Sequence, residues 1–170
     1  MKRVFIYLYA DKFTFIHTKP FKFQFIKDLM KSVDVAVAII TNVKNEVLLQ
    51  KKDQGYIWFP GKWCLFGGRI EENESQEQTL LRELKEELGD VFPLRIDQPK
   101  YFDTKPYRDV HGNKERIGQQ NIYSIQFHGS INDLRIHEGA GFAFFSRFEL
   151  DTLGVVDHDL KAVKDFYDRV

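Results

Sequence analysis

Cysteine is nearly missing from this chain, since Cys64 is the single one among 170 residues. One thiol cannot form an intramolecular disulfide, and no Cys/His cluster with the spacing of zinc ligands accompanies it. Disulfide-stapled scaffolds and structural zinc modules are therefore excluded. A lone thiol favours a reducing compartment, so we expect a cytoplasmic protein.

An excess of charge of either sign is also missing. Lys plus Arg and Asp plus Glu each number 25, which gives a formal net charge of zero. A protein that coats nucleic acid needs a basic excess to displace counterions, so no general nucleic-acid binding is expected. Charges interrupt the apolar runs before any of them is long enough to span a membrane, and no membrane partner is expected. The 43% hydrophobic content instead suits a folded domain.

Aromatic residues are abundant, with 16 Phe, 7 Tyr and 2 Trp, and eight of them lie in the first 30 positions. Phe21, Phe23 and Phe25 alternate as in a strand with one buried face. A short apolar run near the start ends at Asp11, so a secretory signal is not expected. We expect residues 1–31 to form an aromatic-rich, β-rich N-terminal extension. Such an extension covers a sheet edge, or it forms an arm over a substrate or a partner, including a homodimer contact.

Residues 32–170 have the pattern of a single α+β domain. Apolar runs predict strands and amphipathic periodicity predicts helices; the expected elements are a hairpin of 33–40 with 47–49, strands over 121–127 and 142–145, and helices over 75–88 and 158–169. Residues 92–120 are highly charged and interrupted by Pro and Gly. We therefore expect a long exposed loop there, or the tip of a hairpin.

The helix expected over 75–88 has the clearest pattern. Its buried stripe is predicted to hold Leu81, Leu84 and Leu88. Three carboxylates at i, i+3 and i+4 are predicted to gather on the opposite side, namely Glu83, Glu86 and Glu87. Like charges at this spacing repel, so they require a positive partner, and a hard cation such as Mg²⁺ accepts oxygen ligands of this kind. For a lone acidic cluster, a solvated helix face explains the pattern as well.

The surrounding residues complete a longer motif. The segment 68–89 resembles the Nudix box, G-x5-E-x7-R-E-U-x-E-E-x-G-U with U an aliphatic residue. It matches eight of the nine specified positions, namely Gly68, Glu74, Arg82, Glu83, Leu84, Glu86, Glu87 and Gly89. The ninth position holds Asp90, and we expect Val91 or Phe92 to supply the missing packing. Such a match is expected by chance in roughly one in a million chains or fewer.

The resemblance implies a Nudix hydrolase domain over 32–170, in which a mixed β-sheet is sandwiched between helices. It implies that Mg²⁺, or alternatively Mn²⁺, is held by Glu83, Glu86 and Glu87 with a backbone carbonyl of Gly68. Glu74 and Arg82 resemble the structural ion pair of the family. Glu83 and Glu87 are then expected to be catalytic, together with Glu138 on a Gly-rich downstream loop. Members of the family differ in their general base, so Glu83 and Glu138 both stay open for that role.

Substrate contacts are implied more weakly. Lys51 and Lys52, near the end of the second strand, resemble the basic positions that meet phosphates in the family, although solvated surface lysines explain them equally well. Trp63, with Trp58 and Tyr56, is a candidate for stacking on a base, and the alternative for each is a core position. In the 92–120 segment, the candidates for contact with a sugar or a second phosphate are Arg108, His111, Lys114 and Arg116.

The implied reaction is Mg²⁺-dependent hydrolysis of the diphosphate bond in a nucleoside diphosphate linked to another group, such as a nucleotide sugar or a nucleoside triphosphate. The first alternative is a non-catalytic nucleotide-binding Nudix domain, which would be expected to have lost box carboxylates. The second is an isoprenoid diphosphate isomerase of the same fold, in which a cysteine is catalytic, and Cys64 does not clearly fit that role.

Overall fold

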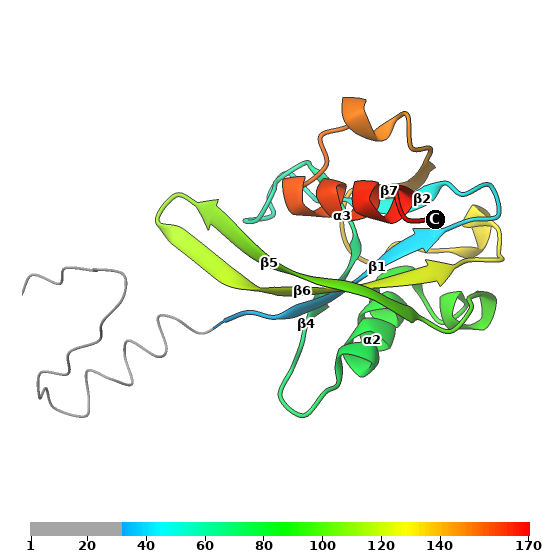
Figure 1. Cartoon of the computed structure of the whole chain (residues 1–170), viewed down its shortest axis with the longest axis horizontal. Helices are drawn as coiled ribbons and strands as arrows, with labels where there is room; N and C mark the ends of the chain where they lie inside the picture. The colour runs from blue at the N-terminus through cyan, green and yellow to red at the C-terminus, as the bar shows by residue number, and fades with distance from the viewer. Residues whose placement is uncertain (1–31) are drawn as a thin grey trace, which may run out of the picture. The chain divides into compact units, whose positions relative to one another are not determined.

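The computed structural model describes residues 32–170, and the N-terminal extension predicted over 1–31 lies outside the described residues. The strands and helices of the described part are β1 (Val35–Thr41), β2 (Val47–Lys51), β3 (Trp63–Cys64), β4 (Phe66–Arg69), α2 (Gln76–Leu88), β5 (Lys100–His111), β6 (Lys114–Gln126), β7 (Gly141–Phe145) and α3 (Asp157–Tyr167). Neither helix in this part of the chain is long and apolar enough to cross a lipid bilayer. The architecture is the expected α+β one, a mixed sheet with a helix on each face (Figure 1).

Strand β1 is the centre of the sheet. It runs parallel to β6 and antiparallel to β2 and β4. The predicted hairpin of the first two strands exists only next to its turn, where Ile40 pairs with Leu48 and Thr41 with Val47. Beyond the turn, β4 takes the place beside β1. This arrangement brings Gly67 and Gly68, at the start of the box, to the middle of the sheet.

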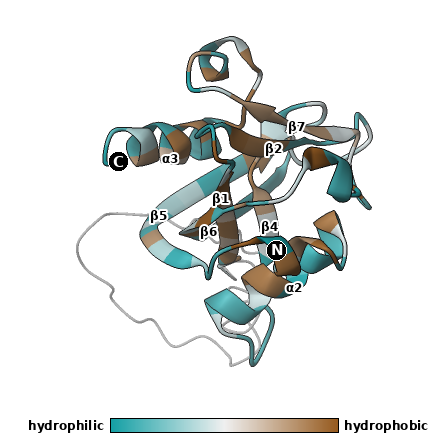
Figure 2. Ribbon diagram, turned by 90° about the vertical axis from the view of Figure 1, so that its right-hand side faces the viewer, coloured by the Kyte–Doolittle hydropathy of each residue, from teal (hydrophilic) through white to brown (hydrophobic). Residues whose placement is uncertain are grey.

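Two hydrophobic cores lie on the two faces of the sheet. Successive residues of a strand point to opposite faces. Ala36, Ala38 and Ile40 of β1 accordingly belong to the core under α2, whereas Val37 and Ile39 belong to the core under α3. Figure 2 shows β1 and β2 as hydrophobic strands between the two helices. Burial on both faces explains why the β1 segment is a continuous apolar run.

Helix α2 begins at the predicted position because Ser75 and Gln78 form a reciprocal capping box. Its buried stripe differs from the prediction in one turn. Leu80 is fully buried and Leu81 is half-buried, while Leu84 and Leu88 are buried as expected. Glu87 is buried as well, so the three carboxylates do not share a solvent-facing side. The prediction of one acidic face was wrong because Glu87 faces the sheet, where its carboxylate accepts hydrogen bonds from Gln50 of β2 and Gly67 of β4.

The segment after the box is a hairpin, the second of the two alternatives expected for residues 92–120, and not a long loop. Strands β5 and β6 pair from Lys100 with Ser124 to His111 with Lys114, and the turn between them contains Gly112. Figure 1 shows this hairpin extending past the rest of the sheet. One face of the arm is buried, but it holds aromatic and polar residues such as Tyr107, Asp109 and Gln120, so the sequence lacks an alternation of hydrophobic and polar residues. Pro106 is tolerated because β5 is an edge strand of the described sheet.

Phe92 supplies the packing that Asp90 cannot. Its side chain is fully buried and stacks on Phe127 with ring centroids 5.6 Å apart. Val91 is 42% exposed, so it does not fill the gap. Phe92 therefore fills the core position that the aliphatic residue of the motif would otherwise occupy, and Asp90 leaves no gap there.

Candidate active site

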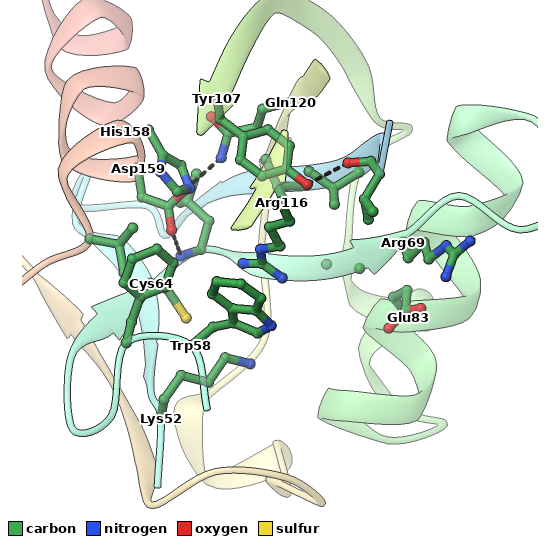
Figure 3. A pocket seen from close by; sticks show the side chains of 18 of the residues that line it. Lys52, Trp58, Cys64, Arg69, Glu83, Tyr107, Arg116, Gln120, His158 and Asp159 are labelled. Carbon is green, nitrogen blue, oxygen red and sulfur yellow. Dashed lines mark hydrogen bonds and ion pairs between the residues drawn. The ribbon is translucent and has the colours of Figure 1, made fainter. Parts of the chain in front are cut away.

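A cavity of about 300 Å³ lies at the ends of β2 and β4, next to the start of α3. One end is acidic and carries two glycines; the residues there are Gly67, Gly68, Glu83, Glu87 and Glu138. The other end is aromatic and polar; its residues include Trp58, Phe59, Tyr107, Arg116, Gln120, His158 and Asp159. Figure 3 shows Glu83 across the cavity from Asp159 and Gln120. We call these the acidic end and the aromatic end.

Glu87 is the most buried carboxylate of the acidic end, with only 4% of its surface exposed. Its Oε1 accepts a hydrogen bond of 2.8 Å from the Gln50 side chain, and its Oε2 accepts one of 3.0 Å from the Gly67 backbone N–H. The Lys52 ammonium lies 4.0 Å from Oε1. Burial raises the pKa of Glu87 to about 7, although Lys52 and these hydrogen bonds act in the opposite direction.

The two glycines leave room for the carboxylates. A Cβ on Gly68 would lie 2.3 Å from the carboxyl carbon of Glu83, so that carboxylate occupies the space of a side chain. Gly67 has a φ of +129°, and a Cβ there would lie 2.1 Å from the carbonyl oxygen of Ala36 in β1. Only glycine at these positions allows the strand to pass against β1 and the helix carboxylates together.

Arg82 joins the carboxylates of the box. Its guanidinium donates to both carboxylate oxygens of Glu74, at 2.8 and 2.9 Å, and to Glu83 at 2.7 Å. A longer contact of 3.3 Å reaches Glu86. The hydrogen bonds from Arg82, together with one from Thr79, lower the pKa of Glu74 to about 2. The positive partner that the carboxylate spacing requires is thus partly supplied by the protein itself.

Arg82→Lys is expected to lower kcat/KM about tenfold, within the range seen when groups that orient metal ligands are lost. A lysine carries a point charge and cannot bridge Glu74 in a bidentate manner while it also contacts Glu83. Steady-state kinetics measures the effect. Lys85→Ala, which removes an exposed ion pair with Asp90 on the same helix, is the matched control. Wild-type kinetics in Arg82→Lys would contradict this role.

The donor set of the acidic end fits a hard divalent cation. Carboxylate oxygens and a backbone carbonyl beside a glycine are the ligands that Mg²⁺ and Mn²⁺ prefer. Within residues 32–170, no three His, Cys, Asp or Glu side chains already converge on one point. Glu83 and Glu86 are instead engaged by Arg82. Of the ligands that the motif implies, Gly68, Glu83 and Glu87 border the cavity, whereas Glu86 does not.

Glu138 reaches the acidic end from a loop that is fixed at two backbone positions. The N–H of His137 donates to the carbonyl of Glu87 at 3.1 Å, and the N–H of Ala140 donates to the carbonyl of Lys51 at 2.8 Å. These bonds tie the loop to the end of α2 and to β2. Glu138 consequently borders both the main cavity and a smaller neighbouring one that also contains Lys52 and Tyr56.

Several predicted site residues lie away from the cavity. Trp63 packs in the core under α3, with its ring centroid 4.7 Å from that of Phe145, and the Lys51 ammonium lies over its outer part. The Glu86 side chain is 61% exposed and borders a different groove, beside Arg82. Three residues of the hairpin are also outside the cavity lining, namely Arg108, His111 and Lys114. The structure does bring Lys52, Tyr56, Trp58 and Arg116 to the cavity.

Other polar residues in or directly beneath the cavity were not predicted: Gln120 and Asp159 line it, and Gln50 lies beneath it. Gln50 and Asp159 are buried polar residues of β2 and α3, and Gln120 is buried in β6. Asp159 accepts hydrogen bonds from the Leu65 N–H at 3.0 Å and from Gln120 at 2.5 Å. The available signal was a polar residue inside an apolar strand run, as in VLLQK. A buried polar side chain needs a hydrogen-bond partner, so a polar residue in an apolar run indicates either a functional site or a hydrogen bond that links two elements.

Cys64 borders the cavity as a buried, free thiol. Burial is the main cause that raises the pKa of this thiol well above its usual range, and the nearby Asp159 acts in the same direction. A thiol in this environment stays protonated and is a poor nucleophile. The burial of this thiol therefore disfavours the alternative of a cysteine-dependent isomerase.

Comparisons with known proteins show which family the chain is similar to. The family model described as the NUDIX domain matches residues 30–168. "Nucleoside triphosphatase NudI" of Escherichia coli O81 is 36% identical over 114 residues, covering 64% of this chain and 77% of the relative. The NUDIX domain of Shewanella oneidensis NrtR, solved with ADP ribose, is 18% identical with a TM-score of 0.65, covering 89% of this chain and 99% of that one. The E. coli dihydroneopterin triphosphate pyrophosphohydrolase is 17% identical with a TM-score of 0.63, covering 81% and 96%.

The chain belongs to the Nudix family. It is a Nudix-type pyrophosphohydrolase, an enzyme that cleaves phosphoric anhydrides. Nudix hydrolases generally use divalent metal ions, which agrees with the all-oxygen donor set of the acidic end.

Proposed function

We propose that this enzyme hydrolyses the diphosphate bond of a nucleoside diphosphate linked to another group, a class that includes nucleoside triphosphates and nucleotide sugars, in the presence of Mg²⁺. The observation that carries the proposal is the division of one cavity into an acidic end and an aromatic end. The acidic end suits a metal-bound diphosphate, and the aromatic end suits a nucleoside. NudI is a nucleoside triphosphatase by name, and the NrtR domain holds ADP ribose, so both relatives fit this class.

The residues of the box have separable roles in this proposal. Glu83 and Glu87, with the Gly68 carbonyl, would hold the ion, and Glu86, which lies outside the cavity lining, would join them. Bound Mg²⁺, or Mn²⁺ in its place, neutralises phosphate oxygens and lowers the pKa of a coordinated water.

The remaining polar groups bind the substrate and move the proton. Lys52, whose ammonium already faces the cavity, binds a phosphate oxygen. Glu138 takes the proton of the attacking water, with Glu83 as the alternative base. Water attacks one phosphorus, the bridging oxygen leaves with the other phosphate, and two phosphate-bearing products form.

The decisive experiment is a substrate panel. Purified protein is incubated with nucleoside triphosphates, nucleotide sugars, ADP-ribose and dinucleoside polyphosphates, with and without Mg²⁺, and products are separated by chromatography. Turnover that requires the cation and releases a nucleoside monophosphate or diphosphate supports the proposal. Nucleotide binding by calorimetry without turnover of any compound would favour the non-catalytic alternative.

Trp58→Ala is expected to raise KM for the preferred nucleotide about tenfold while kcat changes little, because base stacking on an aromatic ring is worth about 1–3 kcal/mol. The Trp58 ring borders the cavity and lies 4.7 Å from the Arg116 guanidinium carbon. Trp58→Phe retains an aromatic face and should recover most of the affinity. Tyr101→Ala, at an aromatic residue that is 59% exposed on β5, controls for loss of a surface ring. An unchanged KM in Trp58→Ala would remove this residue from the base site.

A further inference from the structure

Gln50 is a fully buried amide beneath the acidic end. It lies on β2, where it is paired with Cys64 of β3 on one side and with Phe142 of β7 on the other. None of its surface is exposed. Its position in the sheet is therefore fixed from both neighbouring strands, and its side chain projects toward the carboxylates of α2.

The amide makes a contact at each of its two polar atoms. Its Nε2 donates to Oε1 of Glu87 at 2.8 Å and more weakly to the carbonyl of Leu65 at 3.4 Å. Its Oε1 accepts a hydrogen bond of 3.1 Å from the Lys52 ammonium. The opposite amide orientation would place oxygen against a carboxylate and an NH₂ group against an ammonium, so the neighbouring charges determine which way the amide points.

The amide also lies between two opposite charges. Lys52 is 4.0 Å from Oε1 of Glu87, beyond hydrogen-bond distance, while each of them bonds directly to Gln50. In a buried setting an ammonium and a carboxylate attract strongly. Without the amide, Lys52 is free to move onto Glu87 and form a direct ion pair. That pair would occupy the carboxylate and withdraw the lysine from the cavity.

We propose that Gln50 is a positioning residue that orients the Glu87 carboxylate for a divalent cation and keeps Lys52 apart from it. The inference rests on the proposed function, because it takes Glu87 as a metal ligand. Together with the Gly67 N–H, Gln50 fixes one hydrogen bond on each carboxylate oxygen, which leaves the remaining lone pairs for an ion. Groups that orient metal ligands in this way typically affect metal affinity by 10–100-fold.

The test measures the affinity of Mn²⁺ for the substrate-free protein by titration calorimetry. Gln50→Met keeps the length of the side chain and removes its three hydrogen bonds; the Kd for Mn²⁺ is expected to rise at least tenfold. Gln50→Asn, which retains an amide on a shorter stem, is the second variant if the first does not fold. Asn121→Leu removes another buried amide, one that bonds to Val35 and Thr104, and is the matched control.

Three comparisons decide the outcome. Asn121→Leu should lower thermal stability and leave the Kd for Mn²⁺ within twofold of the wild type, so an equal loss in both variants would show that Gln50 acts through stability alone. An unchanged Kd in Gln50→Met and in Gln50→Asn would overturn the inference. Adding Lys52→Met to Gln50→Met should restore part of the affinity; no recovery would overturn the separating role of the amide.

Glu87→Gln distinguishes this inference from the proposed function. Loss of Mn²⁺ binding in Glu87→Gln together with unchanged binding in Gln50→Met overturns the role of Gln50 alone. Unchanged binding in Glu87→Gln overturns the assignment of the ligand itself. Loss in both variants, with normal binding in Asn121→Leu, supports both.

Discussion

Glu87→Gln is expected to reduce kcat/KM by roughly three orders of magnitude, since stabilisation of transition-state charge by a metal is worth several kcal/mol and each 1.36 kcal/mol is tenfold in rate. The amide is nearly the same size, so it keeps the packing under α2 while it removes the negative charge. Glu77→Gln, in the first turn of the same helix, tests whether loss of any helix carboxylate has this effect. Activity within tenfold of the wild type would exclude Glu87 as a ligand.

The same substitution is expected to stabilise the metal-free protein above neutral pH. The pKa of Glu87 is raised from its usual 4.5 to about 7, so the folded state holds this proton more tightly than the unfolded state. The free energy of unfolding therefore falls as pH rises from about 4.5 to 7, by an amount on the order of 3 kcal/mol, and then levels off.

Denaturant titrations in the presence of a chelator, at pH 5 and pH 8, measure this difference for the wild type and for Glu87→Gln. The wild type should lose more stability between the two pH values than the variant does. Added Mn²⁺ should stabilise the wild type and have little effect on the variant, because a ligand that binds the folded state shifts its stability. If the free energy of unfolding changed with pH by the same amount in both proteins, the raised pKa of Glu87 in the folded state would be contradicted.

Gly67→Ala is expected to destabilise the fold by roughly 3–5 kcal/mol, the sum of a strained backbone and a steric clash. The added Cβ would lie 2.1 Å from a backbone oxygen of β1, which cannot rotate away, and φ at this residue is +129°. The N–H that this residue donates to Glu87 would be displaced at the same time. We expect little folded protein at 37 °C.

Gly154→Ala provides the control for Gly67→Ala. An added Cβ at Gly154 meets no atom within 4 Å, and its φ lies outside the left-handed region. The expected change in stability is within about 1 kcal/mol and in the stabilising direction, because alanine reduces the entropy of the unfolded chain. Thermal melts of the two variants compare a crowded glycine with an open one, and equal melting temperatures would contradict the packing of β4 against β1.

The sequence-based predictions succeeded where the signals are local. Helix α2 has a capping residue at Ser75, an apolar stripe and Gly89 at its end, and all three lie within 15 residues of one another. The hairpin of β5 and β6 has only one local signal, the two-residue turn at Gly112 and Asn113. It is stabilised by pairing with β1 and by edge contacts such as Lys105 with Asp165, which lie far apart in the chain. Its charges therefore resembled those of a loop.

The candidate site was predictable in part for the same reason. The motif places Glu83, Glu86 and Glu87 on one helix, but it does not say which of them is buried. The burial of Glu87 follows from the approach of β2 and β4, and so does its contact with Gln50. Trp63 was predicted to contact the substrate but is not in the cavity. A tryptophan next to a motif suits a core position equally well, and Trp63 packs against the core that includes α3.

The two ends of the cavity are built from different parts of the chain. The acidic end comes mainly from β4 and α2, whereas the aromatic end comes from the β2–β3 loop, the β5–β6 hairpin and the first turn of α3. Because the hairpin contributes to only one of them, exchanging it for that of a relative is a route to a redesigned nucleoside preference with the hydrolytic machinery left in place. Insertions or deletions at the hairpin turn during evolution would likewise change the nucleoside preference and leave the acidic end in place.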